Sequence, residues 1–286
     1  MCSDEGTKEI HDISFYYKII GKGKPIMMLH GGPGLEHTYL LPQMARLAKE
    51  YQLIFYDQRG TGRSSGDVEA TSITLENFLS DLEGLRTQFK LDAMNLMGHS
   101  WGGLLALFYA IRYPENINSL MLINSAAACS DFWKPFEAHI ERNRTQEDRR
   151  MLNDLVESRG FKRRTVESVR EFLTIHFRAY FFNQSHGRHL NLHITEKTAQ
   201  NMDMVNALLF EHIRVYDIHE ELSGFKSPTL IVHGDSDPLP STYSKKIHER
   251  IEHSQYFLLK DCGHFPYIES QEQFFSIVRD FLRDYA

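Results

Sequence analysis

Three absences from the sequence exclude whole classes of protein. The 286 residues include only three cysteines, Cys2, Cys129 and Cys262, and none forms a CxxC pair. An odd number of widely separated cysteines provides no disulfide framework and suits a reducing compartment. No apolar run reaches the roughly 18 residues of a membrane-spanning helix. The first residues, MCSDEGTKEI, do not resemble a signal peptide. We therefore expect a cytoplasmic protein with no membrane partner.

An excess of basic residues is also lacking. Lysine and arginine number 32 against 38 aspartates and glutamates, for a formal net charge of −6. Nucleic acids bind basic surfaces because their phosphates are negatively charged, so no nucleic-acid partner is expected. The arginine-rich segments 141–150 and 159–164 are interleaved with acidic or apolar residues, which is typical of exposed helix faces. A hydrophobic fraction of 42% indicates a folded domain.

Short apolar runs alternate with helical patterns along the first 130 residues. The predicted strands are 25–29, 53–56, 94–97 and 120–123, and the predicted helices are 75–85 and 104–111. Apolar runs without alternation, separated by helices, are typical of a parallel sheet covered on both faces. The fold class is therefore α/β, with a mostly parallel sheet.

The pattern changes near Asp131. From there to about residue 217 the sequence has helical periodicity and many charges but no convincing buried strand. Strand patterns return at 228–232 and 256–259, and an amphipathic helix follows at 274–282. We predict one core formed by residues 1–130 and 218–286, with a helical cap, or lid, inserted at 131–217.

A nucleophile motif lies between a predicted strand and a predicted helix. Gly98-His-Ser-Trp-Gly102 matches G-x-S-x-G, the sharp turn that exposes a serine hydroxyl at the edge of a sheet. Glycines on both sides leave room for that turn. Ser100 is thus the candidate nucleophile, and the start of the following helix adds a positive dipole end near it.

A serine nucleophile needs a base and an orienting acid. Of fifteen histidines, His264 follows the last predicted strand and precedes a helix, which favours it as the base. Asp235 and Asp237 both follow the preceding strand, and Asp235 is the more typical turn-forming residue. For the oxyanion hole we expect the backbone N–H groups of Trp101 and Gly32, because Pro33 has no N–H.

A metal centre is not predicted. His186, His189 and His193 have spacings of three and four that could share a helix face. However, Gly187 disfavours a helix there and no carboxylate accompanies them. We expect neither a metal nor an organic cofactor.

Two glycine-rich loops resemble the proline iminopeptidase branch of the α/β-hydrolases. They are His30-Gly-Gly-Pro-Gly34 and Asp57-Gln-Arg-Gly-Thr-Gly-Arg-Ser64. The resemblance implies an α/β-hydrolase fold with a Ser100–Asp237–His264 triad, whose acid loop in the family reads G-x-x-D. It also implies an acyl-enzyme mechanism, and an aminopeptidase that releases N-terminal proline or another small residue from a small peptide.

One departure keeps other functions open. Proline iminopeptidases hold the substrate's free amine with acidic residues from the cap and near the triad acid, where this chain has Pro238. The candidate in the cap is Glu211, with Glu196 and Asp203 as alternatives. The aromatic cap segment 172–182 favours a carboxylesterase or lactonase acting on a small uncharged acyl substrate. A third hypothesis is a non-enzymatic binding protein with this fold, and a complete triad disfavours it.

Overall fold

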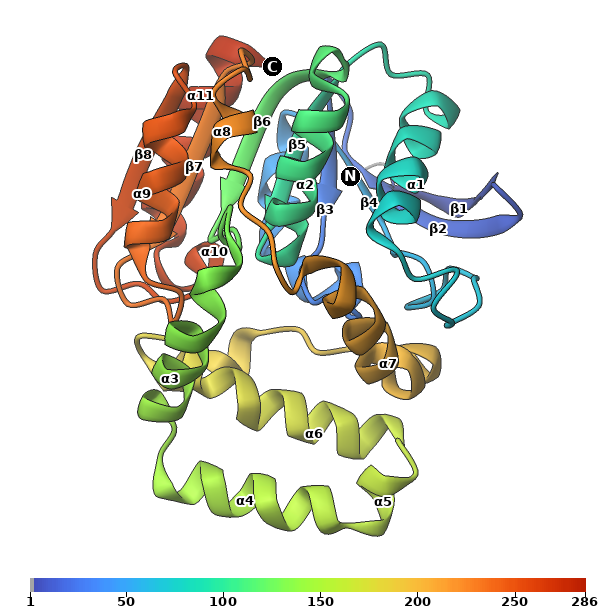
Figure 1. Ribbon diagram of the computed structural model, residues 1–286, viewed down its shortest axis with the longest axis vertical. Helices are drawn as coiled ribbons and strands as arrows, with labels where there is room; N and C mark the ends of the chain where they lie inside the picture. The colour runs from blue at the N-terminus through green and yellow to red at the C-terminus, as the bar shows by residue number, and fades with distance from the viewer. Residues whose placement is uncertain (1–2) are drawn as a thin grey trace.

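A central sheet of eight strands organises the protein in the computed structural model (Figure 1), which describes residues 3–286 and therefore leaves out Cys2. The strand order is β1-β2-β4-β3-β5-β6-β7-β8. The strands are β1 Ser3–Ile10, β2 Ile13–Ile20, β3 Pro25–Leu29, β4 Gln52–Tyr56, β5 Met94–His99, β6 Ile117–Ile123, β7 Thr229–Gly234 and β8 Ser254–Leu259. Strands β3 to β8 pair in parallel, whereas β1 and β2 are antiparallel. The predicted α/β class and mostly parallel sheet are confirmed.

The N-terminal pair of strands was not predicted. Most residues of β1 are exposed or half-buried, with charged side chains among them, so its apolar pattern is weak. It joins the sheet through complete pairing with β2, from Ser3 opposite Ile20 to Ile10 opposite Ile13. Backbone pairing, rather than a buried apolar run, therefore places β1 at the edge.

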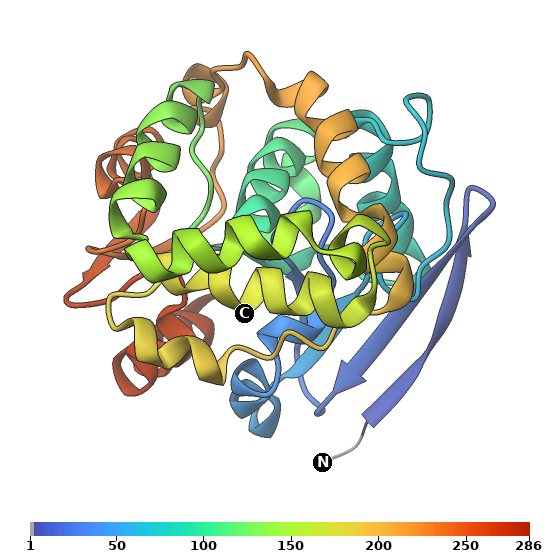
Figure 2. The same cartoon turned by 90° about the horizontal axis from the view of Figure 1, so that it is seen from below.

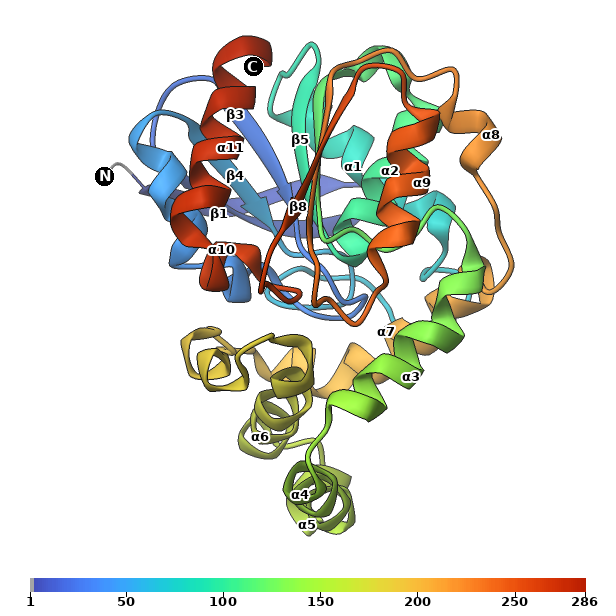
Figure 3. The same ribbon diagram turned by 90° about the vertical axis from the view of Figure 1, so that its left-hand side faces the viewer.

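Helices cover both faces of the sheet (Figure 3). One face carries η2 (Gln43–Lys49), α10 (Pro266–Glu269) and α11 (Gln271–Tyr285). The other carries α1 (Leu75–Gln88), α2 (Trp101–Arg112), α8 (His219–Leu222) and α9 (Ser241–Arg250). Successive residues of β3 alternate between the two resulting cores, Met28 in one and Met27 in the other. Both faces being buried explains why the central strands are apolar throughout.

A helical insertion lies below the sheet in the view of Figure 1, and its helices α4 and α6 cross in front of the sheet in Figure 2. It contains η4 Ser130–Phe132, α3 Trp133–Asn143, α4 Gln146–Glu157, α5 Arg159–Lys162, α6 Val166–His176, η5 Phe177–Tyr180, η6 Gln184–His189 and α7 Glu196–Ile213. We call η4 to α7 the cap. Its two ends meet in an isolated antiparallel bridge between Cys129 and Asp217.

Backbone hydrogen bonds reinforce this base of the cap. The Ser130 N–H donates to the Tyr216 carbonyl at 2.9 Å, and the Ile218 N–H donates to the Ala128 carbonyl at 2.8 Å. The cap is thus a continuous excursion between β6 and β7. No helix within residues 3–286 has the length and apolar character required to cross a lipid bilayer.

Candidate active site

The turn from β5 into α2 holds Ser100 in an unusual backbone conformation. Its φ of 57° and ψ of −122° lie outside the regions that side-chain-bearing residues ordinarily adopt. The turn is also too crowded for side chains on either flank. A Cβ on Gly98 would lie 2.3 Å from the Gly102 carbonyl oxygen, and one on Gly102 would lie 2.3 Å from the Leu29 carbonyl oxygen. Strain of this kind is found where function requires it.

Asp237 and His264 meet from the loops that follow β7 and β8. His264 Nδ1 lies 2.8 Å from Asp237 Oδ2, and both side chains are buried. Since a carboxylate oxygen can only accept here, Nδ1 carries the proton and Nε2 is left as an acceptor. Burial by itself raises the pKa of Asp237, but His264, together with His233 and Asn124, outweighs burial and holds that pKa below its ordinary value.

Asp235 has a different environment from Asp237. One of its carboxylate oxygens accepts from the Ser236 hydroxyl at 2.8 Å and from the Cys262 N–H at 3.3 Å. It therefore ties together the two loops after β7 and β8. His264 is bonded to Asp237 instead, so the structure separates the two aspartates that the residue pattern alone left open.

Ser100 and His264 line the same cavity of about 170 Å³. Among residues 3–286, however, no direct hydrogen bond joins the Ser100 hydroxyl to the His264 imidazole. Contacts of this kind are often long until substrate binds. The structure thus brings His264 and Asp237 into contact, and Ser100 lines the same cavity as His264.

Two backbone N–H groups beside Ser100 are unpaired in the part of the chain that is described, those of Gly32 and Trp101. The neighbouring Gly31 N–H, by contrast, donates to the Tyr39 hydroxyl at 2.6 Å. Gly32 and Trp101 both line the cavity. Trp101 is also the first residue of α2, so the positive end of the helix dipole adds to its N–H. The arrangement can stabilise a negatively charged oxygen.

A chain of hydrogen bonds joins the loop after β3, which carries Gly31, to the loop after β8, which carries His264. His99 Nε2 lies 2.9 Å from the His264 carbonyl and must donate to it. His99 Nδ1 therefore accepts from the Tyr39 hydroxyl at 2.8 Å, and the Tyr39 oxygen accepts from Gly31. Burial, followed by the nearby His264, lowers the pKa of His99 to about 3, so the ring is neutral. Nothing in the residue pattern had singled out Tyr39.

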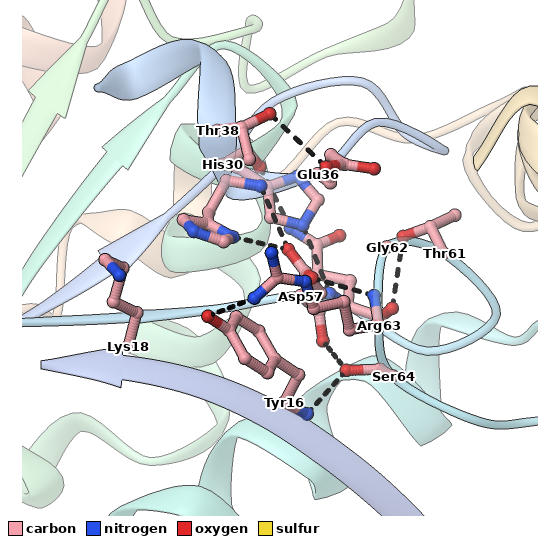
Figure 4. Close-up of polar contacts among 12 residues, drawn as sticks. Tyr16, Lys18, His30, Glu36, Thr38, Asp57, Thr61, Gly62, Arg63 and Ser64 are labelled. Carbon is pink, nitrogen blue, oxygen red and sulfur yellow. Dashed lines mark hydrogen bonds and ion pairs between the residues drawn. The ribbon is translucent and has the colours of Figure 1, made fainter. Parts of the chain in front are cut away.

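The loop after β4 supports the same region through a buried carboxylate, Asp57 (Figure 4). Asp57 accepts from the His37 ring at 2.7 Å and from the Arg63 N–H at 2.9 Å. Burial alone would raise the pKa of Asp57, but these contacts hold it below its ordinary value. Hydrogen bonds thus fix the Asp57–Ser64 segment in place beside the loop that carries Gly31.

Glu36 anchors the cap to the loop after β3 that carries Gly32. One of its carboxylate oxygens accepts from the Thr195 N–H at 2.8 Å and from the Thr198 hydroxyl at 2.6 Å. Its other oxygen accepts from the Thr38 hydroxyl, a contact drawn in Figure 4. Thr195 caps the N-terminus of α7, where a negative charge is favourable. The carboxylate therefore holds α7 next to the loop that carries Gly32.

The cavity walls are rich in aromatic side chains. Eight phenylalanine, tyrosine and tryptophan residues line it within the described chain: Tyr39, Trp101, Phe132, Trp133, Phe136, Phe177, Tyr180 and Phe265. No aspartate, glutamate, lysine or arginine among residues 3–286 lines this cavity. Asn206 on α7 contributes a neutral amide, and its side chain is exposed at the mouth. The cavity is therefore suited to an uncharged, apolar group.

Glu211, the residue predicted to contact a substrate amine, lies outside the lining of this cavity. Glu211 is exposed and does not line the cavity, although it lies on the same helix as Asn206. Five residues of an α-helix correspond to a rotation of about 140°, which turns its side chain away from Asn206. Glu196 is exposed too, and Asp203 forms a 2.8 Å ion pair with Arg164.

The histidine-rich segment forms a short 3₁₀ turn and the loop after it. The rings of His186 and His189 are 6.2 Å apart, and His186 Nδ1 lies 3.7 Å from Glu269. Within the described range, no group of three histidine, cysteine, aspartate or glutamate side chains is arranged to hold a metal ion.

Known proteins resemble this chain along nearly its whole length. Residues 24–271 match the family model described as alpha/beta hydrolase fold. A proline iminopeptidase from Saccharolobus solfataricus is 27% identical, covering 98% of this chain and 92% of that protein. A proline iminopeptidase from Lactobacillus helveticus is 28% identical, with 97% of each chain covered. The crystal structure of a proline iminopeptidase from Mycobacterium smegmatis superposes with a TM-score of 0.72 at 20% identity, covering 98% of both chains.

Proposed function

Because this chain belongs to the α/β-hydrolase family and is a hydrolase, we propose that Ser100, His264 and Asp237 form its catalytic triad. The observation that carries the proposal is the buried 2.8 Å contact between His264 and Asp237, in a cavity that Ser100 also lines. That contact leaves His264 Nε2 as the acceptor that a serine proton requires. The N–H groups of Gly32 and Trp101, which have no partner within residues 3–286, support an oxyanion site in the same cavity.

Acylation begins when Ser100 Oγ attacks the substrate carbonyl and His264 Nε2 takes its proton. The carbonyl oxygen becomes negatively charged and accepts from the N–H groups of Gly32 and Trp101. Asp237 stabilises the imidazolium that has formed. The tetrahedral intermediate then collapses, the bond to the leaving group breaks, and His264 returns the proton to that group. The acyl group remains on Ser100.

Deacylation repeats these roles with water as the nucleophile. His264 takes a proton from the water as it attacks the acyl carbonyl, and the same N–H groups hold the new oxyanion. Collapse breaks the bond to Ser100 Oγ, which recovers its proton from His264. The products are a free acid and the amine or alcohol released earlier, and no cofactor takes part in either half.

The favoured substrate is a small peptide with N-terminal proline or another small residue. The full-length similarity to proteins named proline iminopeptidase supports it. A cavity of about 170 Å³ with aromatic walls suits a small apolar ring such as that of proline. Asn206, whose side-chain oxygen can accept from an amine, takes the role first expected of Glu211.

A second candidate is an esterase or lactonase that acts on a small uncharged acyl group. The specific observation in its favour is that no carboxylate among residues 3–286 lines the cavity. A protonated amine placed there would have no charged partner, and desolvating an unpaired charge is costly.

One substrate comparison separates the two candidates. Purified protein is offered proline-β-naphthylamide, a panel of other aminoacyl arylamides and short p-nitrophenyl esters of matched size. We expect turnover of proline-β-naphthylamide and loss of that turnover when the amine is acetylated. Turnover of esters alone, with no requirement for a free amine, would replace the peptidase with the second candidate.

A further inference from the structure

We propose that Gln58 is a positioning residue that holds both N–H donors of the oxyanion hole at their required spacing. The inference rests on the proposed function, because it concerns the site formed by Ser100, Gly32 and Trp101. Gln58 is 2% exposed and does not line the cavity. Its side chain therefore acts through its neighbours rather than on the substrate.

The Gln58 amide contacts both halves of the oxyanion hole. Its Oε1 accepts from the indole N–H of Trp101 at 2.9 Å, and its Nε2 donates to the His30 carbonyl at 2.9 Å. An indole N–H can only donate and a carbonyl can only accept, so the amide has one possible orientation. One buried side chain thus links the residue that supplies one donor to the loop that supplies the other.

The His30 side chain adds a second link to Gly32, which starts from the Gln58 backbone and not from its side chain. The Gln58 backbone N–H donates to His30 Nε2 at 3.1 Å, which places the remaining ring proton on Nδ1. Nδ1 then donates to the Gly31 carbonyl at 2.8 Å. That carbonyl and the Gly32 N–H belong to one planar peptide unit, in which they point in opposite directions when the bond is trans. Holding the Gly31 oxygen therefore aims the Gly32 N–H.

The other donor is constrained in the same way. The Ser100 carbonyl shares its peptide unit with the Trp101 N–H, and it accepts from the Gly103 N–H at 2.9 Å and the Ala126 N–H at 3.0 Å. The Trp101 side chain is then tied to Gln58. Since an oxyanion donor acts only within about 0.2 Å of its best distance, a support common to both donors matters more than either anchor alone.

The test compares two conservative changes at Gln58 with a matched change elsewhere. Gln58→Met removes both side-chain bonds at nearly constant volume, whereas Gln58→Glu keeps an acceptor for Trp101 and loses the donor to His30. Asn95→Leu is the control: Asn95 is also a buried amide, donating to the Pro25 carbonyl at 3.1 Å and accepting from the Ser119 hydroxyl at 2.9 Å. It lies at the start of β5, away from the donors.

Kinetics distinguish positioning from a general loss of structure. We expect each Gln58 variant to lower kcat by about 10-fold or more with KM within about 2-fold, since losing an oxyanion donor outright costs about 10²–10³. An aryl trifluoromethyl ketone forms a serine adduct that carries an oxyanion. Its affinity for each variant should decrease in parallel with kcat/KM. Asn95→Leu should change neither quantity, although it loses comparable buried hydrogen bonds.

Trp101→Phe provides a variant that keeps the backbone N–H. It should lower kcat less than Gln58→Met, and the double variant should be no worse than Gln58→Met, because both remove the same bond. A folded Gln58→Met or Gln58→Glu protein with wild-type kcat would overturn the proposal, as would equal losses in Asn95→Leu. Failure of the wild-type protein to react with a fluorophosphonate at Ser100 would instead overturn the proposed function, and this inference with it.

Discussion

Asn124 donates its side-chain amide to the same Asp237 oxygen that bonds His264. The Nδ2–Oδ2 distance is 2.5 Å, and Asn124 Nδ2 also lies 3.1 Å from the Gly263 carbonyl. Asn124 is fully buried at the end of β6, with a φ of 42°. It joins the loop of Asp237 to the loop of His264, and it is one of the groups that hold the pKa of Asp237 low despite burial.

Replacing Asn124 with leucine should therefore weaken catalysis without removing any triad side chain. Loss of the donor raises the pKa of Asp237 and frees the His264 loop, so we expect kcat to fall about 10-fold, and further at acidic pH. Steady-state kinetics from pH 5 to 8 measure this. The same Asn→Leu change at Asn95 serves as control, and an unchanged kcat with an unchanged pH profile would argue against the role.

Ser100→Ala removes the proposed nucleophile. We expect kcat to fall by about 10⁴-fold or more, the scale known for triad members, with little effect on folding. Fluorophosphonate labelling followed by mass spectrometry should mark the wild-type protein and not the variant. Ser125→Ala is a suitable control, because Ser125 is a buried serine near Ser100 whose hydroxyl donates to the Ala126 carbonyl at 2.8 Å. Labelling that persists in Ser100→Ala would point to another nucleophile.

The free energy of unfolding should depend on pH through two buried histidines. Burial lowers the pKa of His30 to about 4, and burial and then His264 lower that of His99 to about 3, from an ordinary value near 6.5. Below about pH 6.5 these histidines bind protons in the unfolded chain but not in the folded protein, so the free energy of unfolding decreases as the pH falls. Above that pH these two residues have no effect.

Urea unfolding at pH 8, 6.5 and 5 measures this dependence. Each histidine should lower the free energy of unfolding by roughly 1–2 kcal/mol between pH 6.5 and 5, because one pKa unit corresponds to about 1.4 kcal/mol. His99→Gln should remove its share of the slope, whatever its stability at pH 8. Equal slopes in the variant and the wild type would mean that His99 is protonated in the folded protein.

Asn206→Asp should increase the preference for substrates with a free amine. A carboxylate at the exposed mouth of the cavity gains about 0.2–1 kcal/mol from a cation, so kcat/KM for proline-β-naphthylamide should rise up to about 5-fold relative to a neutral ester. Asn206→Leu is the control and should lower that ratio. The ratio is measured at low salt. An unchanged ratio in both variants would show that Asn206 takes no part in amine recognition.

Local patterns explain why much of the fold was predictable. The six parallel strands are short, largely apolar runs, and the nucleophile turn needs glycines at 98 and 102 for steric reasons that the chain itself carries. The base and acid were expected in loops after the last two strands, and the structure brings those loops into contact. The strands β1 and β2 were missed, and for β1 the reason is a weak apolar pattern, since pairing with β2 holds it at the edge.

Contacts between distant residues were not predictable in this way. Gln58 bonds to a residue 43 positions away, Tyr39 to one 60 away and Asn124 to one 113 away. Tyr39 and Asn124 belong to no motif, and the motif that contains Gln58 does not indicate its partners. The cap shows the same limit, since Glu211 and Asn206 both lie on α7 but only Asn206 lines the cavity.

The sequence by itself thus determined the α/β class, the strand-end loops and the chemical groups they carry. Tertiary structure alone decided which of two aspartates bonds His264, which N–H groups stay unpaired and which charges reach the cavity. The physical reason is that backbone sterics and apolar periodicity act over a few neighbouring residues. Hydrogen-bond partners and burial of charge, in contrast, depend on where the sheet and the cap bring separate loops together.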